Sequence, residues 1–201
     1  ENSKHLIERL LKEGHELASH TWFHSSFEEK HLKESRERLE QLFSTKVTGL
    51  RMPRMMPVDE KAVENAGYSY NSSVNPTFLP GRYNNFKVSR TYFKEGNLMQ
   101  IPASVSPNFR IPLFWLSFHN FPLFFYKKLA FDVLKKDNYL NIYFHPWEFS
   151  GIKDEAFKLP GFTTKNTGED MIKRFDEFVG WLKSKNHTFG TFQEFQKRVE
   201  S

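Results

Sequence analysis

Two histidines four residues apart, His20 and His24, are the strongest candidates for metal ligands in this sequence. Neutral imidazole is a common protein ligand of zinc and related divalent metals. The H-E-x-x-H pair of helical zinc enzymes has the same spacing, but Thr21 stands here where that motif carries its glutamate base. The pair therefore indicates half of a metal site, although two histidines with purely structural roles would also fit the pattern.

A catalytic zinc site usually needs a third protein ligand, often a carboxylate, and an open position for water. Four carboxylates are candidates for the third ligand, but the spacing of none of them from the two histidines identifies it as that ligand: Glu16, Glu28, Asp59 and Glu148. The chain contains no cysteine, which excludes disulfides, cysteine-ligated zinc and thiol catalysis.

Two further candidates each follow a predicted strand. His145, in His145-Pro146-Trp147-Glu148, could act as a general acid, because imidazole titrates near neutrality and can protonate a leaving amine. The alternative for His145 is a loop histidine that is hydrogen bonded to the backbone. Arg51 could hold a catalytic carboxylate through a bidentate pair, or it could be an ordinary surface residue.

Hydrophobic periodicity and cap residues predict the elements that must position these side chains. Helices are predicted at 3–13, after a capping box at Ser25 or Ser26, at about 59–66, at 122–136, at about 169–185 and at the C-terminus. Strands are predicted at 17–19, 47–51, 68–70, 87–93, 98–103, 139–144 and 188–191, with a loop at 71–85. Because helices and strands alternate, we predict a mainly parallel α/β sheet or barrel. The candidate residues then lie just after strands, where parallel α/β proteins build their sites.

The composition fits one globular domain spanning residues 1–201. The net charge of +5 permits an anionic partner, but the lysines and arginines are scattered through mixed-charge helices, so we do not expect nucleic acid binding. The most apolar segment, Ile111 to Tyr126, is too short and too interrupted to span a bilayer. It predicts a buried loop-helix junction, with a membrane-surface or polymer-contact patch as the alternative. Aromatic residues make up 16% of the chain, and exposed ones would suit stacking against sugar rings.

Several motifs resemble those of one enzyme family. Gly14-His15-Glu16 with His20-Thr21-Trp22-Phe23-His24 resembles the second motif of the polysaccharide deacetylases, carbohydrate esterase family 4. Arg51-Met52-Pro53 is similar to the family's R-x-P motif, and Tyr143 to Glu148 resembles the late histidine motif of a branch that carries H-P-W-E. Three more segments fit that branch or the family's closing region: Tyr70 to Val74, Pro80 to Tyr83 and Thr188 to Phe192. The resemblance thus covers nearly the whole chain in family order.

The resemblance implies a distorted (β/α) barrel and metal-dependent removal of N-acetyl groups from the amino sugars of a polysaccharide, either an exopolysaccharide or a cell-wall glycan. Such a substrate favours a location in the cell envelope or outside the cytoplasm. By position, His20 and His24 would bind a divalent metal, zinc first and cobalt or nickel as alternatives. His145 would be the general acid, and Arg51 would orient the catalytic base. The remaining assignments are substrate contact for Trp147, Tyr70 and Asn71, and support of the site for Thr21, Pro53 and Glu148.

The chain departs from the family in its acidic residues. The family's first motif, T-F-D-D-G, supplies the base and the third metal ligand, yet no aspartate precedes Asp59 here, and Asn71 stands where the related branch has an aspartate. We therefore expect a barrel that is incomplete at its N-terminus and a weak or empty metal site. The exposed sheet edge would pair with another chain or be covered by a loop. The alternative function is a non-catalytic carbohydrate-binding or structural member of the family.

Overall fold

The structure is a computed structural model that describes residues 3–24, 26–151 and 159–201. The chain divides into two compact units. The sheet unit comprises Glu1–Val74, Tyr92–Pro102 and Phe189–Ser201, and the helical unit comprises Asn75–Thr91 and Ala103–Thr188. The single domain expected from the chain length stays a prediction.

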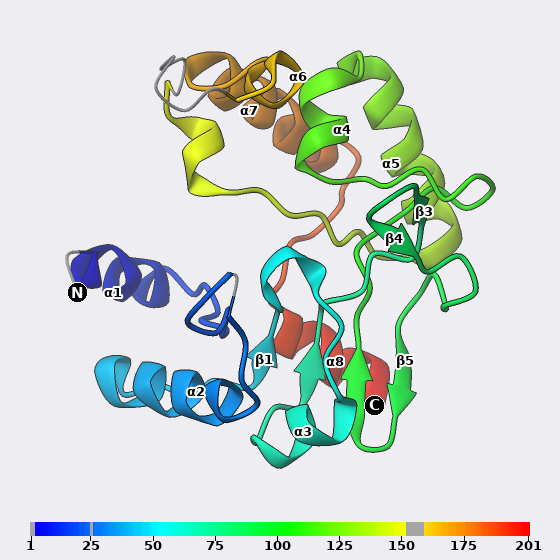
Figure 1. Cartoon of the computed structure of the whole chain (residues 1–201). Coiled ribbons are helices and arrows are strands. Elements are labelled where there is room, and N and C mark those ends of the chain that lie inside the picture. Colours follow the sequence, from blue (N-terminus) through cyan, green and yellow to red (C-terminus); the bar gives the residue numbers. More distant parts are fainter. Residues whose placement is uncertain (1–2, 25, 152–158) are drawn as a thin grey trace. The chain divides into compact units, whose positions relative to one another are not determined.

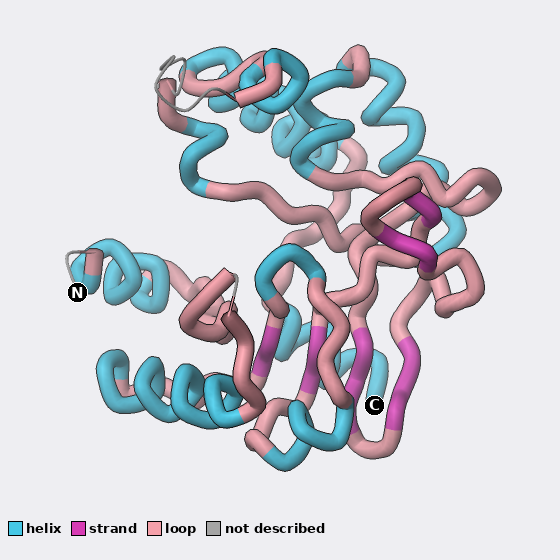
Figure 2. Tube along the Cα trace, viewed as in Figure 1, coloured by secondary structure: helices cyan, strands magenta, loops and turns pink. Residues whose placement is uncertain are grey.

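A four-stranded sheet forms the centre of the sheet unit (Figures 1 and 2). Its strands, in spatial order, are β1 (Gly49–Leu50), β2 (Tyr70–Asn71), β6 (Leu98–Gln100) and β5 (Phe93–Glu95). The β1–β2 and β2–β6 pairs are parallel, and β5 returns antiparallel to β6 through a turn at Gly96, which has a φ of 63°. The three parallel strands therefore present their carboxyl ends at one edge of the sheet.

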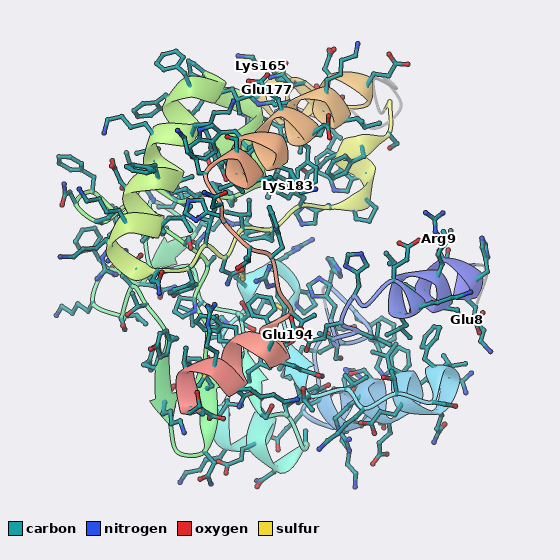
Figure 3. All side chains as sticks on the ribbon, turned by 180° about the vertical axis from the view of Figure 1, so that it is seen from behind. Glu8, Arg9, Lys165, Glu177, Lys183 and Glu194 are labelled. Atoms are coloured by element: carbon teal, nitrogen blue, oxygen red, sulfur yellow. The ribbon has the colours of Figure 1, made fainter. Side chains whose placement is uncertain are left out.

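Helices and a 3-10 turn complete the sheet unit. They are α1 (Lys4–Lys12), α2 (Lys30–Phe43), η1 (Pro53–Met55), α3 (Glu60–Asn65) and α8 (Phe192–Glu200). The view in Figure 1 and the reverse view in Figure 3 both place α8 across one face of the sheet. Thr191 and Glu194, the latter labelled in Figure 3, form a reciprocal capping box that begins α8.

Apolar burial holds α2 and α3 against the sheet. The core of this unit consists of Leu32, Val47, Leu50, Met52, Ala62, Val63, Ala66, Tyr68 and Leu98, all of them buried. Removal of this much apolar surface from water is the main force that stabilises such a unit.

The helical unit has its own aromatic core. Its elements are β3 (Phe78–Leu79), β4 (Tyr83–Asn84), α4 (Trp115–Asn120), α5 (Leu123–Asp137), η2 (Pro146–Phe149), α6 (Gly161–Thr164) and α7 (Glu169–Ser184). The rings of Phe118, Tyr126 and Phe178 meet edge to face, with centroids 4.9–5.6 Å apart. Edge-to-face geometry places the positive edge of one ring on the negative face of the next, and it fixes α4, α5 and α7 to one another.

The structure confirms the predicted mixture of helices and strands. Every predicted helix is present, but α2 does not begin with the expected capping box. Ser25 lies outside the described residues, and Glu29, which makes no side-chain cap bond, precedes α2 instead of Ser26. The described residues form an open sheet, so a closed barrel is not confirmed. Along the part of the chain that is described, no helix combines the length and apolar character needed to cross a bilayer.

Four strand or loop predictions were wrong. Residues 139–144 and 188–191 form no strand, the predicted strand at 87–93 begins only at Phe93, and the predicted loop at 71–85 contains the β3–β4 hairpin. Figure 2 shows 139–144 as loop. The Asn141 carbonyl accepts from the Ser104 amide and the Tyr143 carbonyl accepts from the Trp115 amide, so neighbouring residues of this run bond to different segments. The apolar segment from Ile111 contains the short helix α4 as well as the expected junction.

Candidate active-site residues

The segment that carries the two histidines lies along the outer edge of β1. Ser19 bridges to Leu50 in the parallel sense, its amide donates to the Gly49 carbonyl at 2.9 Å, and the Arg51 amide donates to the Ser19 carbonyl at 2.9 Å. The predicted strand at 17–19 is thus reduced to one bridging residue. That bridge places His20 beside Arg51, at the carboxyl end of β1.

The ring of His20 is oriented by the backbone of Arg51. Nδ1 of His20 lies 2.6 Å from the Arg51 carbonyl oxygen, and because a carbonyl only accepts, Nδ1 is the protonated nitrogen. In the neutral ring Nε2 then carries the lone pair. Histidines that ligate metals usually donate their other N–H in this way.

His24 completes a pair of imidazoles. Its ring centroid lies 5.2 Å from that of His20, at an interplanar angle of 83°, and both residues are exposed. Two nitrogen donors at the surface fit half of a zinc-type site. Among the described residues no group of three histidine, aspartate or glutamate side chains could hold a metal ion, so these residues do not complete such a site.

The four carboxylates considered from the sequence have other partners. Glu16 accepts the Tyr70 hydroxyl at 2.6 Å and the Gln193 amide at 3.0 Å, which ties the motif to β2 and to the first turn of α8. Glu28 pairs with Lys30 at 2.7 Å, and Asp59 caps α3. Glu148 lies in the helical unit.

Thr21 holds an unusual backbone conformation between the two histidines. Its φ of 55° is left-handed, which is a genuine outlier for a β-branched residue and marks local strain. The Thr21 amide donates to Ser19 Oγ at 3.2 Å, a bond within the motif loop. Its buried Oγ1 has no hydrogen-bond partner within the described part of the chain.

The side chain of Arg51 is fixed by the end of β2. Its Nε donates to the Ser72 carbonyl at 2.9 Å and its Nη2 donates to Ser72 Oγ at 2.7 Å. The Ser72 hydroxyl in turn donates to the Ile101 carbonyl at 2.7 Å, so Arg51 is connected across β2 to β6. The guanidinium also lies 6.0 Å from the Phe192 ring centroid. Pro53 is buried at the start of η1.

Tyr70 and Asn71, expected at the substrate, are buried inside the sheet unit. Burial, followed by the neighbouring Glu16 carboxylate, raises the pKa of the Tyr70 hydroxyl, which therefore stays a hydrogen-bond donor. The side-chain oxygen of Asn71 accepts from the Ser73 hydroxyl. Both side chains are buried, and their contact with substrate stays a prediction.

His145 begins η2 in the helical unit and is held by Glu148. Its backbone N lies 2.6 Å and its Nδ1 lies 2.7 Å from Glu148 Oε1. Nδ1 therefore donates, which leaves Nε2 as the atom for proton transfer. The ring stacks on Trp147, with centroids 5.9 Å apart, and the side chain is 38% exposed.

Glu148 has a second partner that sequence reasoning missed. Its other oxygen, Oε2, lies 2.8 Å from Nε2 of His119 in α4, and neither side chain is exposed. Burial raises the pKa of Glu148, but the hydrogen bonds from His119 and His145 outweigh it and lower that pKa below its ordinary value. The signal for His119 in the sequence was a single histidine within the apolar segment from Ile111.

The comparisons with known proteins agree with the motifs. A family model described as polysaccharide deacetylase matches residues 1–70, which contain His20, His24 and Arg51. A solved crystal structure from Mycobacterium smegmatis, assigned by name to the polysaccharide deacetylases, is 14% identical with a TM-score of 0.62. The match covers 98% of this chain and 67% of that chain, and at this identity it shows the mixed α/β fold. No curated protein matched the chain.

Proposed function

We propose that this chain, a member of the polysaccharide deacetylase family, removes N-acetyl groups from the amino sugars of a polysaccharide. The observation that carries the proposal is the orientation of His20 by the Arg51 carbonyl, with His24 at 5.2 Å between ring centroids. Two family motifs are thereby joined at the carboxyl end of a parallel strand.

His20 and His24 would hold a divalent metal, zinc first and cobalt or nickel as alternatives, which when bound polarises the acetamide carbonyl and its attacking water. Because two histidines are fewer than the three protein ligands usual in such sites, the described residues alone predict weak binding.

The other residues act on protons and on orientation. His145, whose Nδ1–H is held by Glu148, would deliver a proton from Nε2 to the leaving amine. Arg51, whose guanidinium is fixed by Ser72, would orient the carboxylate that serves as base. Trp147, which stacks on the His145 ring, would contact a sugar. A general acid placed in this way contributes about 10²- to 10⁴-fold to the rate.

The test is acetate release from N-acetylglucosamine oligosaccharides by the complete gene product that contains this chain, loaded in turn with zinc, cobalt and nickel. We expect His20→Gln and His24→Gln to abolish release and metal binding together. The matched control is His15→Gln, which changes a histidine of the same segment that has no role in the proposal. If no metal supports acetate release by the wild-type protein, the proposal fails.

A second candidate function is carbohydrate binding without catalysis. It is favoured by one observation, that the described residues bring no third ligand to His20 and His24. Calorimetric binding of the same oligosaccharides, with no acetate released under any metal, would select it.

A further inference from the structure

His119 is a fully buried histidine whose two ring nitrogens both face oxygen atoms. Nδ1 lies 2.5 Å from the Lys165 carbonyl oxygen and Nε2 lies 2.8 Å from Glu148 Oε2. Lys165, labelled in Figure 3, follows α6. The Trp115 and Trp147 rings lie 5.8 and 6.4 Å from the His119 ring, centroid to centroid.

The identity of these two neighbours decides how many protons His119 carries. The Lys165 carbonyl only accepts, so Nδ1 must bear a hydrogen. A neutral ring protonated at Nδ1 would then direct the Nε2 lone pair at Glu148 Oε2, and two acceptors would face each other at 2.8 Å. Protonation at Nε2 alone would instead set the Nδ1 lone pair against the carbonyl. With Glu148 ionised, only the imidazolium satisfies both contacts.

The hydrogen bonds of Glu148 favour its ionised form. Besides His119 Nε2, both the backbone amide and Nδ1 of His145 are directed at the carboxylate, through Oε1, and together these groups lower the pKa of the carboxyl. A carboxylate with no exposed surface is unfavourable without a countercharge. His119 supplies that countercharge within hydrogen-bond distance.

The rest of the surroundings keeps His119 in place without competing for its ring. Asn166 Nδ2 donates to the His119 carbonyl at 2.6 Å. Arg174 of α7 donates from Nε to the Phe118 carbonyl at 2.8 Å and lies 5.1 Å from the Phe118 ring centroid. The titratable and charged side chains that the described contacts bring to this cluster are therefore Glu148, His145 and Arg174.

We propose that His119 is a positioning residue for His145. As an imidazolium it fixes the buried Glu148 carboxylate, and Glu148 fixes His145 with its hydrogen on Nδ1 and its reactive nitrogen at Nε2. Because this role depends on His145 as the general acid, the inference rests on the proposed function. No proton leaves His119 during the reaction, since its task is to keep the carboxylate charged and in position.

The first test is ¹⁵N NMR of the full chain with labelled histidine. We expect both ring nitrogens of His119 to be protonated at neutral pH, and His145 in its neutral form to be the Nδ1–H tautomer. In His119→Gln, the side-chain amide can still donate to Glu148 but carries no charge, so Glu148 takes up a proton and His145 becomes a mixture of tautomers. A single ring proton on wild-type His119 would overturn the proposal, and this measurement does not require the variant to fold.

The second test is the rate of acetate release by the metal-loaded complete gene product. His119→Gln is expected to lower kcat about 10- to 100-fold, the usual effect of removing a residue that orients a catalytic side chain, with little change in KM. His31→Gln is the matched control, because His31 is also buried in a helix but lies in the sheet unit. An unchanged kcat in His119→Gln, or an equal fall in the control, would count against the positioning role.

The two proposals fail in different ways. If the wild-type protein releases no acetate, the proposed function is wrong, and the spectra alone then decide the inference about His119. Two ring protons on His119, with a His145 tautomer that changes in His119→Gln, support it. An unchanged tautomer overturns it.

Discussion

The Nδ1 atom of His20 lies 2.6 Å from the carbonyl oxygen of Arg51, although 31 residues separate the two in the sequence. The backbone of Arg51 therefore orients a candidate metal ligand, while its guanidinium is held by Ser72. One residue serves the site in two ways, through two separable groups.

Arg51→Lys should separate these roles. The backbone carbonyl that orients His20 is retained, but an ammonium group cannot reproduce the two parallel contacts of the guanidinium with Ser72. We expect acetate release to fall about 10- to 100-fold with no change in metal affinity, measured by competition with a chromogenic chelator. Arg54→Lys, at a neighbouring exposed arginine, should leave both unchanged. A parallel loss of metal in Arg51→Lys would contradict this division.

Gly49 in β1 is expected to tolerate no side chain. A Cβ atom there would lie 1.9 Å from Cζ of Tyr70, the residue whose hydroxyl donates to Glu16. Gly49→Ala should lower the free energy of unfolding by about 3 kcal/mol, the upper range for overpacking, because Tyr70 must leave its site. Urea denaturation measures the change. Gly180→Ala is the control, since Gly180 lies within α7 with nothing near its added Cβ, and it should stabilise by roughly 0.5–1 kcal/mol.

The Glu16 carboxylate should stabilise the sheet unit rather than bind metal. It bridges the Tyr70 hydroxyl and the Gln193 amide at the positive end of α8. Glu16→Ala leaves both donors without this acceptor, so we expect a loss of about 2 kcal/mol in urea unfolding. Glu13→Ala, at an exposed carboxylate paired with Arg9, should leave the free energy of unfolding unchanged, because solvent screens the pair. A Glu16→Ala protein that keeps its stability but loses metal would reverse the assignment.

Periodicity and capping signals were sufficient for the longer helices, and α8 begins with its own capping box, but the short helices α4 and α6 were not predicted. The motif residues His20 and Arg51 were also correctly expected at a strand end, since the residues after neighbouring parallel strands gather at one edge of a sheet. Strand predictions failed where pairing with a neighbouring segment, and not the segment's own sequence, decides whether a strand forms. The apolar run at 139–144 has the composition of a buried strand but is loop in the described structure. The strands β3 and β4 have two residues each and are too short to show alternation.

The contacts of His119 could not be predicted from the sequence for a different reason. A lone histidine in an apolar segment does not indicate which residues it contacts. Its partners Glu148 and Lys165 lie 29 and 46 residues away in the sequence. Only the fold brings these groups together. Glu148 itself was expected to support the site, but its burial and its two histidine partners could not be read from the H-P-W-E motif.

Glu148→Gln should show how the cluster depends on pH. The pKa of Glu148 is lowered in the folded chain, so its ionised form contributes stability above the unfolded pKa of about 4.3, and this contribution is lost as pH falls through the lower folded value. We expect the variant to unfold more easily by about 3 kcal/mol at pH 7, because His119 then lacks its ionised partner. The difference from wild type should shrink as the pH falls below about 4. Urea unfolding of both proteins across this range is the measurement.

Glu177→Gln serves as the control, because it removes an exposed carboxylate of the same unit whose surface pair with Lys127 is worth less than about 1 kcal/mol. A difference between wild type and Glu148→Gln that stays constant down to about pH 3 would show that the pKa of Glu148 is not lowered in the folded protein.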